Sequence, residues 1–465
     1  MNRFEIREHA ASILVAALSS TFGVALLLVT DDLAVYLRNT DAGSSAAVQV
    51  VLRFIAFVFI AIALYTAAVI TSNTFATIIA GRTRTIALLR LLGATARSQR
   101  RAVAREGLLV GVIGAIIGIA VGVGANAIVV GVSIATGFLP NLAFAWFSPI
   151  ELLPAAAVLV TTWLASWIGS RRVLVVSPVQ ATGAAQERPA SGLARRHGRN
   201  VWAALLFAGG VALLLLAVVI GQHSAEGLLV GVVGGMLSFT GVVLGAEVVM
   251  PPALRLVGQL FGRSAPARLA ARNAVRYPER SARTTIGIVI GVTLVTMFSV
   301  AVQTFLVLAD AVRRSEPQSY QQTGQILTVL AVIFSIVSGF SALLAAIGMV
   351  NNLSLSVLQR IRELGLLRVL GFTARQIRGM IVAESAQLTL TAVLVGLLLG
   401  TFYGWAGAEC LLGSARGGPG IVWPAFPPVL LITIVVSAVL LTWLASVAPT
   451  RRATRVTPVD ALAVE

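Results

Sequence analysis

Lysine is missing from this chain of 465 residues, and cysteine and histidine are rare. All 35 basic residues are arginine, so the phosphate-binding loop of P-loop ATPases, which requires a lysine, is excluded. The single cysteine, Cys410, rules out an internal disulfide and a cysteine-based metal site, and the three scattered histidines disfavour a histidine cluster. We expect no metal site, no cofactor, no catalytic residue and no ATP hydrolysis by the chain itself.

Charged residues are also scarce, at 11% of the chain, whereas 57% of the residues are hydrophobic. Apolar runs of about 20 residues, the length that crosses a bilayer as a helix, recur along the chain. The sequence therefore predicts an all-α polytopic membrane protein with about ten transmembrane helices. The spans are expected at residues 11–30, 48–80, 104–133, 149–170, 201–221, 227–250, 285–308, 324–355, 381–408 and 426–448.

The net charge of +17 has a one-sided distribution. With the N-terminus inside, the outer segments hold only Arg38, Arg313, Arg314 and Arg416, and nearly all other arginines fall on the cytoplasmic side. The positive-inside rule then places both termini in the cytoplasm and argues against nucleic acid as a partner. The first apolar run has no clear cleavage site, so no signal peptide is expected. We expect a multi-pass protein of the bacterial cytoplasmic membrane.

An internal repeat organises the chain. Residues 73–106 and 351–384 align without a gap, and a second pair of similar stretches begins at Trp163 and Trp443. An even number of spans separates equivalent helices, so the two copies enter the membrane from the same side. We predict parallel duplicated four-helix units around two central helices, in a 4+2+4 arrangement. The expected boundaries are 1–183 for the first unit, 184–264 for the linker and central helices, and 265–465 for the second unit.

Each copy of the repeat contains a short arginine-rich segment between two spans. Residues 83–92 and 361–370 have helical periodicity, which places Ile86, Leu89 and Leu92 on one side of the first helix. Gly93 and Gly371 follow where a helix end favours a left-handed residue, and Thr95 and Thr373 are candidate N-caps of the next helix. Such a helix could dock on a soluble partner or lie on anionic lipid. Its duplication on one face of the membrane favours docking.

The residues of the second copy resemble the sequence pattern of a known protein family. From Asn351 to Glu384 the chain follows the pattern N-x-L-x-x-S-V-x-x-R-x-R-E-x-G-x-L-R-x-L-G-x-x-x-x-Q-I and then a glycine-rich helix. The stretches VSPVQA at 176–181, VTPVDA at 456–461 and AARNAVRYPERSARTTIG at 270–287 add to it. The chain thereby resembles the FtsX-like or MacB-like permease family of ABC transporters over about four-fifths of its length.

This resemblance implies a cytoplasmic ATPase dimer as partner, with one permease chain to two ATPase subunits and with ATP and Mg²⁺ bound by the ATPase. It implies that the short segments couple the two proteins. The implied coupling residues are Leu88, Leu89, Arg90, Leu92, Gly93 and Thr95 in the first unit and Leu366, Leu367, Arg368, Leu370, Gly371 and Thr373 in the second. The first copy departs from the pattern, because Thr85 and Ala87 stand where the second copy has Glu363 and Gly365.

The short outer loops restrict the range of activities that we expect. The loops at 31–47 and 309–323 leave no room for the large external domain that many members of the family carry. The resemblance then favours outward movement of a lipophilic or amphiphilic compound, such as an antimicrobial, a peptide or a lipid. Two other functions stay open: a non-transporting signalling scaffold coupled to an ATPase, and an ion-coupled secondary carrier.

Two further groups of residues are candidates for a role inside the membrane. Glycines at four-residue spacing favour close helix packing, or helices that slide on one another. These are Gly107, Gly111, Gly114, Gly118 and Gly122 in the third span and Gly396, Gly400 and Gly404 in the ninth.

The second group is charged and consists of Arg53, Glu106 and Glu384. Arg53 is expected to pair with Asp31 or Asp32 or to reach the headgroups, and substrate contact is the alternative. For Glu106 and Glu384 we expect stabilisation of a helix start or pairing with Arg105 or Arg378, with proton coupling as the alternative. Another acid, Glu247, is expected to pair with a cytoplasmic arginine.

Overall fold

The computed structural model describes residues 3–38, 46–81, 83–137, 147–171, 197–224, 226–261, 278–315, 371–413 and 421–428, with a few single residues beside them. All regular structure in these ranges is helical, as the composition predicts. The chain divides into two compact units, Met1–Ala185 and Gln186–Glu465, which are described separately below.

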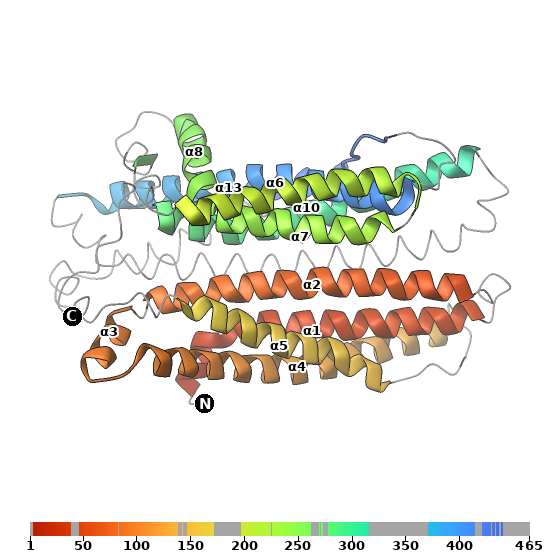
Figure 1. Ribbon diagram of the computed structural model, residues 1–465, viewed down its shortest axis with the longest axis horizontal. Helices are drawn as coiled ribbons and strands as arrows, with labels where there is room; N and C mark the ends of the chain where they lie inside the picture. Colours follow the sequence, from red (N-terminus) through yellow and green to blue (C-terminus); the bar gives the residue numbers. More distant parts are fainter. Residues whose placement is uncertain are drawn as a thin grey trace. The chain divides into compact units, whose positions relative to one another are not determined.

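The first unit is built from four long helices and two short ones (Figure 1). They are α1 (Arg3–Arg38), α2 (Ala46–Gly81), α3 (Thr83–Leu91), α4 (Ala96–Ala135), the short 3-10 helix η2 (Pro149–Glu151) and α5 (Leu152–Gly169). Helix α4 packs against both α1 and α5. A core of Ala16, Phe75, Val110 and Val158 joins all four long helices.

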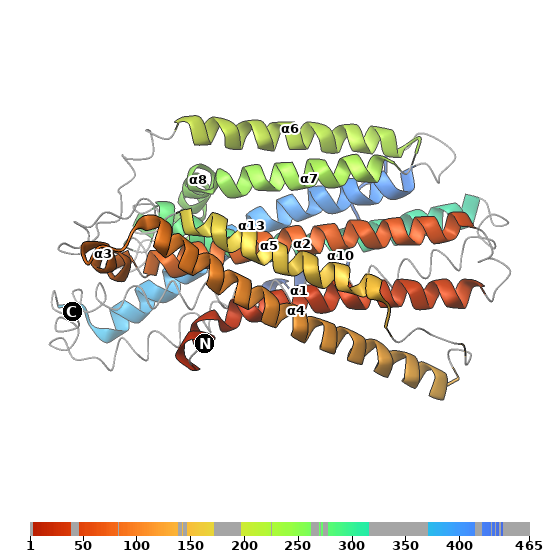
Figure 2. The same ribbon diagram turned by 60° about the horizontal axis from the view of Figure 1, so that its bottom comes forward.

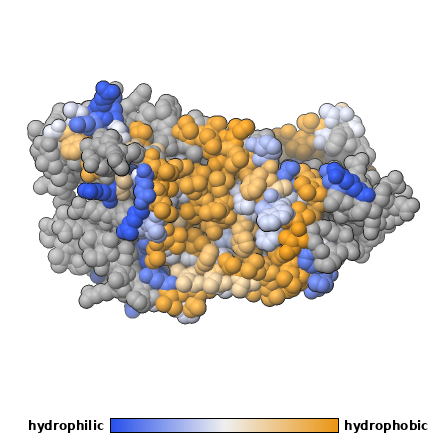
Figure 3. All heavy atoms as spheres, turned by 90° about the horizontal axis from the view of Figure 1, so that it is seen from above, coloured by the Kyte–Doolittle hydropathy of each residue, from blue (hydrophilic) through white to orange (hydrophobic). Residues whose placement is uncertain are grey.

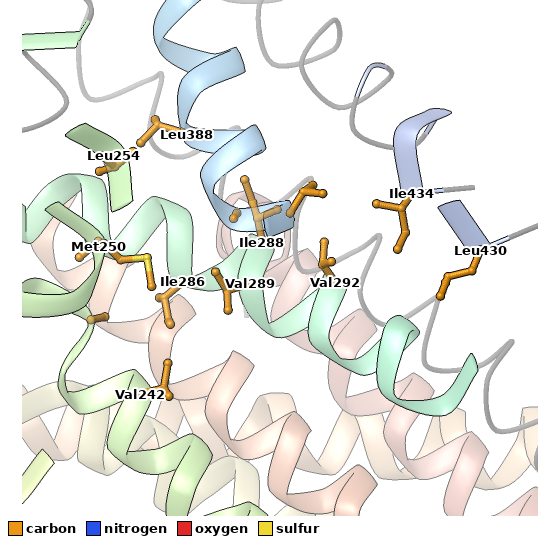
Figure 4. Packing of buried hydrophobic residues seen from close by; sticks show 14 of the residues in the cluster. Val242, Met250, Leu254, Ile286, Ile288, Val289, Val292, Leu388, Leu430 and Ile434 are labelled. Carbon is orange, nitrogen blue, oxygen red and sulfur yellow. The ribbon is translucent and has the colours of Figure 1, made fainter. Parts of the chain in front are cut away.

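The second unit combines a helical hairpin with a pair of long helices (Figure 2). Its elements are α6 (His197–Gly221), α7 (Gly227–Leu244), α8 (Ala246–Gly258), the 3-10 helix η6 (Gln259–Phe261), α10 (Pro278–Ser315) and α13 (Ala374–Leu412). Helices α6 and α7 pack together through close backbone approaches, and α10 packs along α13. An apolar cluster of α7, α8, α10 and α13 residues, with Leu430 and Ile434, forms the core (Figure 4).

Seven helices in the described ranges are long and apolar enough to cross a membrane. Their spans are Ser12–Val29, Ala96–Ala135, Pro149–Gly169, Gly198–Gly221, Gly227–Leu244, Thr285–Leu308 and Arg375–Leu411. Helix α2 covers the expected span at 48–80 and holds a shorter apolar stretch, Ile60–Asn73. The expected span at 324–355 lies outside the described residues, as does most of the one at 426–448. On the face seen in Figure 3, apolar side chains cover the middle and hydrophilic ones lie toward the ends.

Two boundaries differ from the expectation. The span predicted to run to residue 250 ends at Leu244, because Gly245 interrupts the helix and α8 begins anew at Ala246. The outer loops predicted at 31–47 and 309–323 are helical in part, since α1 continues to Arg38, α2 begins at Ala46 and α10 continues to Ser315. No glycine or proline stands in either extension to stop the helix, and polar sequence alone does not end one.

Candidate functional site

The turn between α3 and α4 has the structure that its sequence predicts. The amides of Leu92, Gly93 and Ala94 donate to carbonyls within α3 over 3.1, 3.1 and 2.9 Å. Gly93 has φ +97°, a left-handed conformation that residues with a Cβ disfavour. Thr95 is the N-cap of α4, and its Oγ1 accepts a hydrogen bond from the amide of Ser98 at 3.1 Å. The turn is therefore closed on both sides by backbone bonds.

One side of α3 is fixed to the unit and the other is left exposed. Ile86 and Ala87 are buried with Ile79, and Val103 of α4 packs against them. The sequence analysis placed Ile86 on one side of the helix with Leu89 and Leu92, but Ile86 is buried and holds α3 in place, whereas the two leucines are exposed. The fully buried Ala87 leaves no space for a larger side chain, which explains a small residue at this position of the repeat.

The outward side of α3 carries an apolar patch, which we call the leucine patch. Leu88, Leu89, Leu91 and Leu92 are 47%, 38%, 53% and 85% exposed. Four exposed leucines on one short helix are unfavourable in water and are typical of a surface that another apolar surface covers. Arg90 is half-buried on the opposite side of the helix, so the patch itself is apolar and is suited to a partner with an apolar groove.

The second copy of the turn repeats this geometry as far as the structure describes it. Gly371 has φ +91°, and Thr373 is the N-cap of α13. Gln376 completes a reciprocal cap, in which its amide donates to Thr373 Oγ1 at 3.3 Å and its side-chain Oε1 accepts from the Thr373 amide at 2.9 Å. Leu366, Leu367, Arg368 and Leu370 lie outside the described residues.

Arg100, which the sequence analysis did not single out, joins the start of α4 to the end of α5. Its guanidinium lies 4.5 Å from the ring centre of Trp167 and donates to Ser170 Oγ and to the Trp167 carbonyl, both at 3.3 Å. A cation over an aromatic face is attractive, and the two bonds fix its direction. The helix that follows the leucine patch is thereby tied to another helix of the same unit.

Glycines of α4 lie where this helix crosses its two neighbours. A Cβ added at Gly111 would lie 3.1 Å from the Leu159 carbonyl oxygen of α5, and one at Gly114 would lie 2.5 Å from Ala16 Cβ of α1. Gly107 meets Ser166 of α5 in the same way, and Gly118 and Gly122 meet Ser20 and Val24 of α1. The helix backbones touch at these positions, so a larger residue would separate the helices.

The glycines of α13 have the same relation to α10. A Cβ at Gly396 would lie 2.7 Å from Val292 Cβ, and one at Gly400 would lie 2.5 Å from Thr296 Cβ. Gly404 packs on the backbone of Met297. In both units the helix that follows the coupling turn is held to a long neighbour by glycine contacts.

The charged candidates have different positions from those expected. Helices α4 and α13 begin at Ala96 and Ala374, so Glu106 and Glu384 lie about three turns inside them. The expected stabilisation of a helix start by these carboxylates is therefore wrong, since that effect fades within the first turn. Glu384 is buried at 5% exposure. Arg53 lies on α2, and its side chain is outside the described part of the structure.

Two acids of the first unit, the half-buried Asp32 and the buried Glu151, accept hydrogen bonds that the sequence analysis did not predict. Asn126 of α4 donates to Asp32 Oδ2 of α1 at 2.7 Å. Burial raises the pKa of Asp32 above its ordinary value of 3.8, the bond from Asn126 lowers the pKa in part, and the charge of Asp31 raises it further. Glu151 is 1% exposed, and its Oε1 accepts from the Ser148 amide at 3.0 Å. For Glu151, the available signal was a single acid at the start of an apolar run.

A second buried acid ties together three segments of the second unit. Glu409 of α13 is fully buried, and its carboxylate accepts from Gln222 Nε2 at 2.9 Å and from the Val422 amide at 2.8 Å. The Val422 carbonyl in turn accepts from Trp405 Nε1 at 2.8 Å.

The expected pairing of Glu247 with an arginine is confirmed, because Arg199 of α6 forms a two-bond ion pair with it.

Long apolar helices, tight glycine crossings and polar turns between spans define a multi-pass helical membrane protein. A family model described as FtsX-like permease C-terminal matches residues 57–178 and again residues 335–458. The chain belongs to this family of FtsX-like permeases, and the resemblance given by its motifs is confirmed. Each matched segment contains one turn with a left-handed glycine, at Gly93 or Gly371, and one glycine-rich helix.

Three similar proteins share parts of the chain. The uncharacterised ABC transporter permease YknZ of Bacillus subtilis is 29% identical over 143 residues, 30% of this chain and 34% of its own length. The macrolide export ATP-binding/permease protein MacB of Nitrobacter winogradskyi is 29% identical over 132 residues, 28% of this chain and 19% of its own. The uncharacterised ABC transporter permease MJ1507 of Methanocaldococcus jannaschii is 32% identical over 83 residues, which are 18% of this chain and 21% of its own length. The chain thus spans about a third or less of each relative.

Proposed function

We propose that the chain is the transmembrane permease subunit of an ABC transporter and that a separate cytoplasmic ATPase dimer drives it. The observation that carries the proposal is the leucine patch, four exposed leucines on a helix that Ile86 and Ala87 fix to the unit. The family match in two segments and the capped glycine turn in both copies support a second, equivalent patch around Leu367. Two patches on one chain fit two ATPase subunits.

The sequence indicates which of the two proteins binds ATP. Without a lysine the chain has no phosphate loop of the usual kind, so ATP and Mg²⁺ are assigned to the ATPase. The proposed arrangement is the full 4+2+4 set of ten helices, with units at 1–183 and 265–465 around a middle part at 184–264. Both termini and both coupling turns lie on the cytoplasmic side of the bacterial cell membrane, where the arginines gather.

The proposed activity is export of a lipophilic or amphiphilic compound, such as an antimicrobial, a peptide or a lipid. Membership of the permease family and the printed function of MacB, macrolide export, support this direction and this kind of substrate. The compound would enter from the bilayer, because the outer loops expected from the sequence are too short to form an external binding domain.

The proposal is tested by purifying the full chain with a candidate ATP-binding subunit from the same genome and measuring the mass of the intact complex. One chain with two ATP-binding subunits is the expected result. The complex in inside-out vesicles should then accumulate a fluorescent amphiphile only when ATP is supplied. A chain that binds no ATP-binding subunit would contradict the proposal. ATP turnover in a 1:2 complex without accumulation would instead favour the signalling scaffold.

A further inference from the structure

Helix α8 leaves the bundle of the second unit at the end of a membrane span. Its predecessor α7 is one of the candidate spans, Gly227–Leu244, and only Gly245 separates the two helices. Since consecutive Cα atoms are about 3.8 Å apart, α8 begins within roughly 8 Å of the end of that span. Figures 1 and 2 both show α8 running across the direction of α7.

The surface of α8 has three different sides, which follow from its 3.6-residue period. The first side is buried against the core and consists of Ala246, Met250, Leu254 and Val257. On one flank of this side, Val249 and Leu256 are 44% and 67% exposed, and Leu260 of η6 extends the flank with 74% exposure. We call these three residues the apolar flank.

The side of α8 that faces away from the core holds one exposed charge. Arg255 is exposed there, and Glu247 lies at the edge of this side in its ion pair with Arg199. Val248 and Pro252 are exposed apolar residues near Arg255, and Gln259 of η6 lies between Arg255 and the apolar flank. A helix with one buried side, an apolar flank and an exposed arginine beside that flank fits a boundary between an apolar and an aqueous phase.

The direction of these sides is fixed by contacts with α13. Gln387, which is 1% exposed, donates from Nε2 to the Leu254 carbonyl oxygen at 2.8 Å. Met250 and Leu254 lie in the same apolar cluster as Ile286 of α10 and Leu388 of α13 (Figure 4). The helix therefore cannot turn its apolar flank inward without breaking a buried hydrogen bond and an apolar core.

We propose that α8 lies in the headgroup layer of the inner leaflet, with the apolar flank against acyl chains and Arg255 on anionic lipid headgroups. Residues 251–284 contain seven arginines and one glutamate, and the inner leaflet attracts such a basic segment. Connection to a span places the apolar flank at bilayer depth, where a soluble protein would have to displace lipid. The inference rests on the proposed topology, which puts this end of α7 in the cytoplasm. Neither segment matched by the family model includes α8.

The test measures depth from two matched positions of the full chain. In a Cys410→Ala background, Leu256→Cys and Arg255→Cys each carry an environment-sensitive fluorophore, and the chain is reconstituted in nanodiscs that contain nitroxide-labelled lipid. The fluorophore at 256 should be quenched several-fold more by the nitroxide than the one at 255, which water-soluble iodide should quench instead. Equal quenching by iodide at both positions would overturn the proposal.

Lipid charge supplies the second readout. Quenching at 256 should be stronger in nanodiscs with anionic lipid than in zwitterionic ones, and Arg255→Gln should remove the difference. If quenching at 256 does not depend on lipid charge, the proposed contact of Arg255 with anionic headgroups is wrong. Protection of 256 that needs an added ATP-binding subunit would show a protein as the occupant and would also overturn the proposal. Because nanodiscs contain the chain alone, failure here is separate from failure to bind an ATPase.

Discussion

Asp32 is an acid whose burial costs free energy at neutral pH. Its folded-state pKa is raised, so the folded chain holds the proton more tightly than the unfolded chain. The stability that this proton supplies is complete below the unfolded pKa and is lost as the pH rises through the folded pKa. The bond from Asn126 offsets part of the cost and explains how a charge is tolerated there.

Replacement of Asp32 by asparagine should therefore stabilise the first unit above the folded pKa. The shape and the acceptor oxygen for Asn126 are kept, and the charge is removed. Melting temperatures of Asp32→Asn and the unaltered chain in detergent should differ at pH 7 and converge as the pH falls towards 3.8. The partner change, Asn126→Leu, should lower the melting temperature at pH 7. A pH-independent effect of Asp32→Asn would contradict this account.

Gly93 is the residue on which the coupling turn depends for its backbone shape. A Cβ at this position has open space around it, so any effect of a substitution comes from φ +97° and not from a clash. Gly93→Ala should destabilise the turn by roughly 1 to 2 kcal/mol. Hydrogen exchange of the α3 amides should accelerate by about tenfold, since 1.4 kcal/mol corresponds to that factor. Gly93→Asn, which tolerates the left-handed region, should exchange more slowly than Gly93→Ala, and the reverse order would exclude backbone strain as the cause.

At the scale of the element, α4 offers a comparison between two kinds of glycine. Gly114 touches Ala16 of α1, whereas Gly131 in the same helix has nothing within 4 Å of an added Cβ. Gly114→Leu should overpack the crossing and destabilise the first unit by about 1–3 kcal/mol. Gly131→Ala should leave stability unchanged or raise it by up to about 1 kcal/mol, because alanine favours the helix.

Thermal unfolding of both variants, followed by tryptophan fluorescence or protease resistance, checks this prediction. Equal destabilisation by Gly114→Leu and Gly131→Ala would show that close packing does not distinguish the two positions. An unaffected Gly114→Leu would show that α1 and α4 do not touch at this crossing.

The sequence was sufficient to predict those elements that depend only on residues near each other in the chain. The glycine of the turn, the two N-cap threonines and the short helix at 83–91 follow from backbone preferences of residues near each other in the chain. The direction of Ile86 could not be predicted in this way. Its burial depends on Ile79 of α2 and Val103 of α4, and a helical pattern does not show which apolar residue a neighbour will cover.

Distant contacts explain the remaining differences. Asp32 and Asn126 are 94 residues apart, and Gln222 and Glu409 are 187 apart, so their bonds depend on helix packing that no motif encodes. The break at Gly245 was missed because residues 227–250 are apolar except at a few positions such as Glu247, and hydropathy does not distinguish one long helix from two helices in series.

At the scale of the whole molecule, the sequence repeat and the described structure both support an internal duplication. The repeat at 73–106 and 351–384 falls inside the two segments that the family model matches. Both copies contain a left-handed glycine, a threonine N-cap and a following helix packed through glycines. Under the proposed function, each of the two turns would contact one subunit of a dimeric ATPase.

ATP turnover by the assembled complex tests this central claim most directly. Leu89→Glu and Leu367→Glu place a carboxylate in each patch, and the loss of one buried leucine, about 1.5–3 kcal/mol, should weaken each contact by roughly tenfold or more. Ser98→Glu is the control, because it adds the same charge at an exposed position beside the first patch. The account predicts partial loss of stimulated turnover in each single variant, complete loss in the double variant and normal turnover in the control. A double variant that assembles with the ATPase and stimulates it fully would contradict the account.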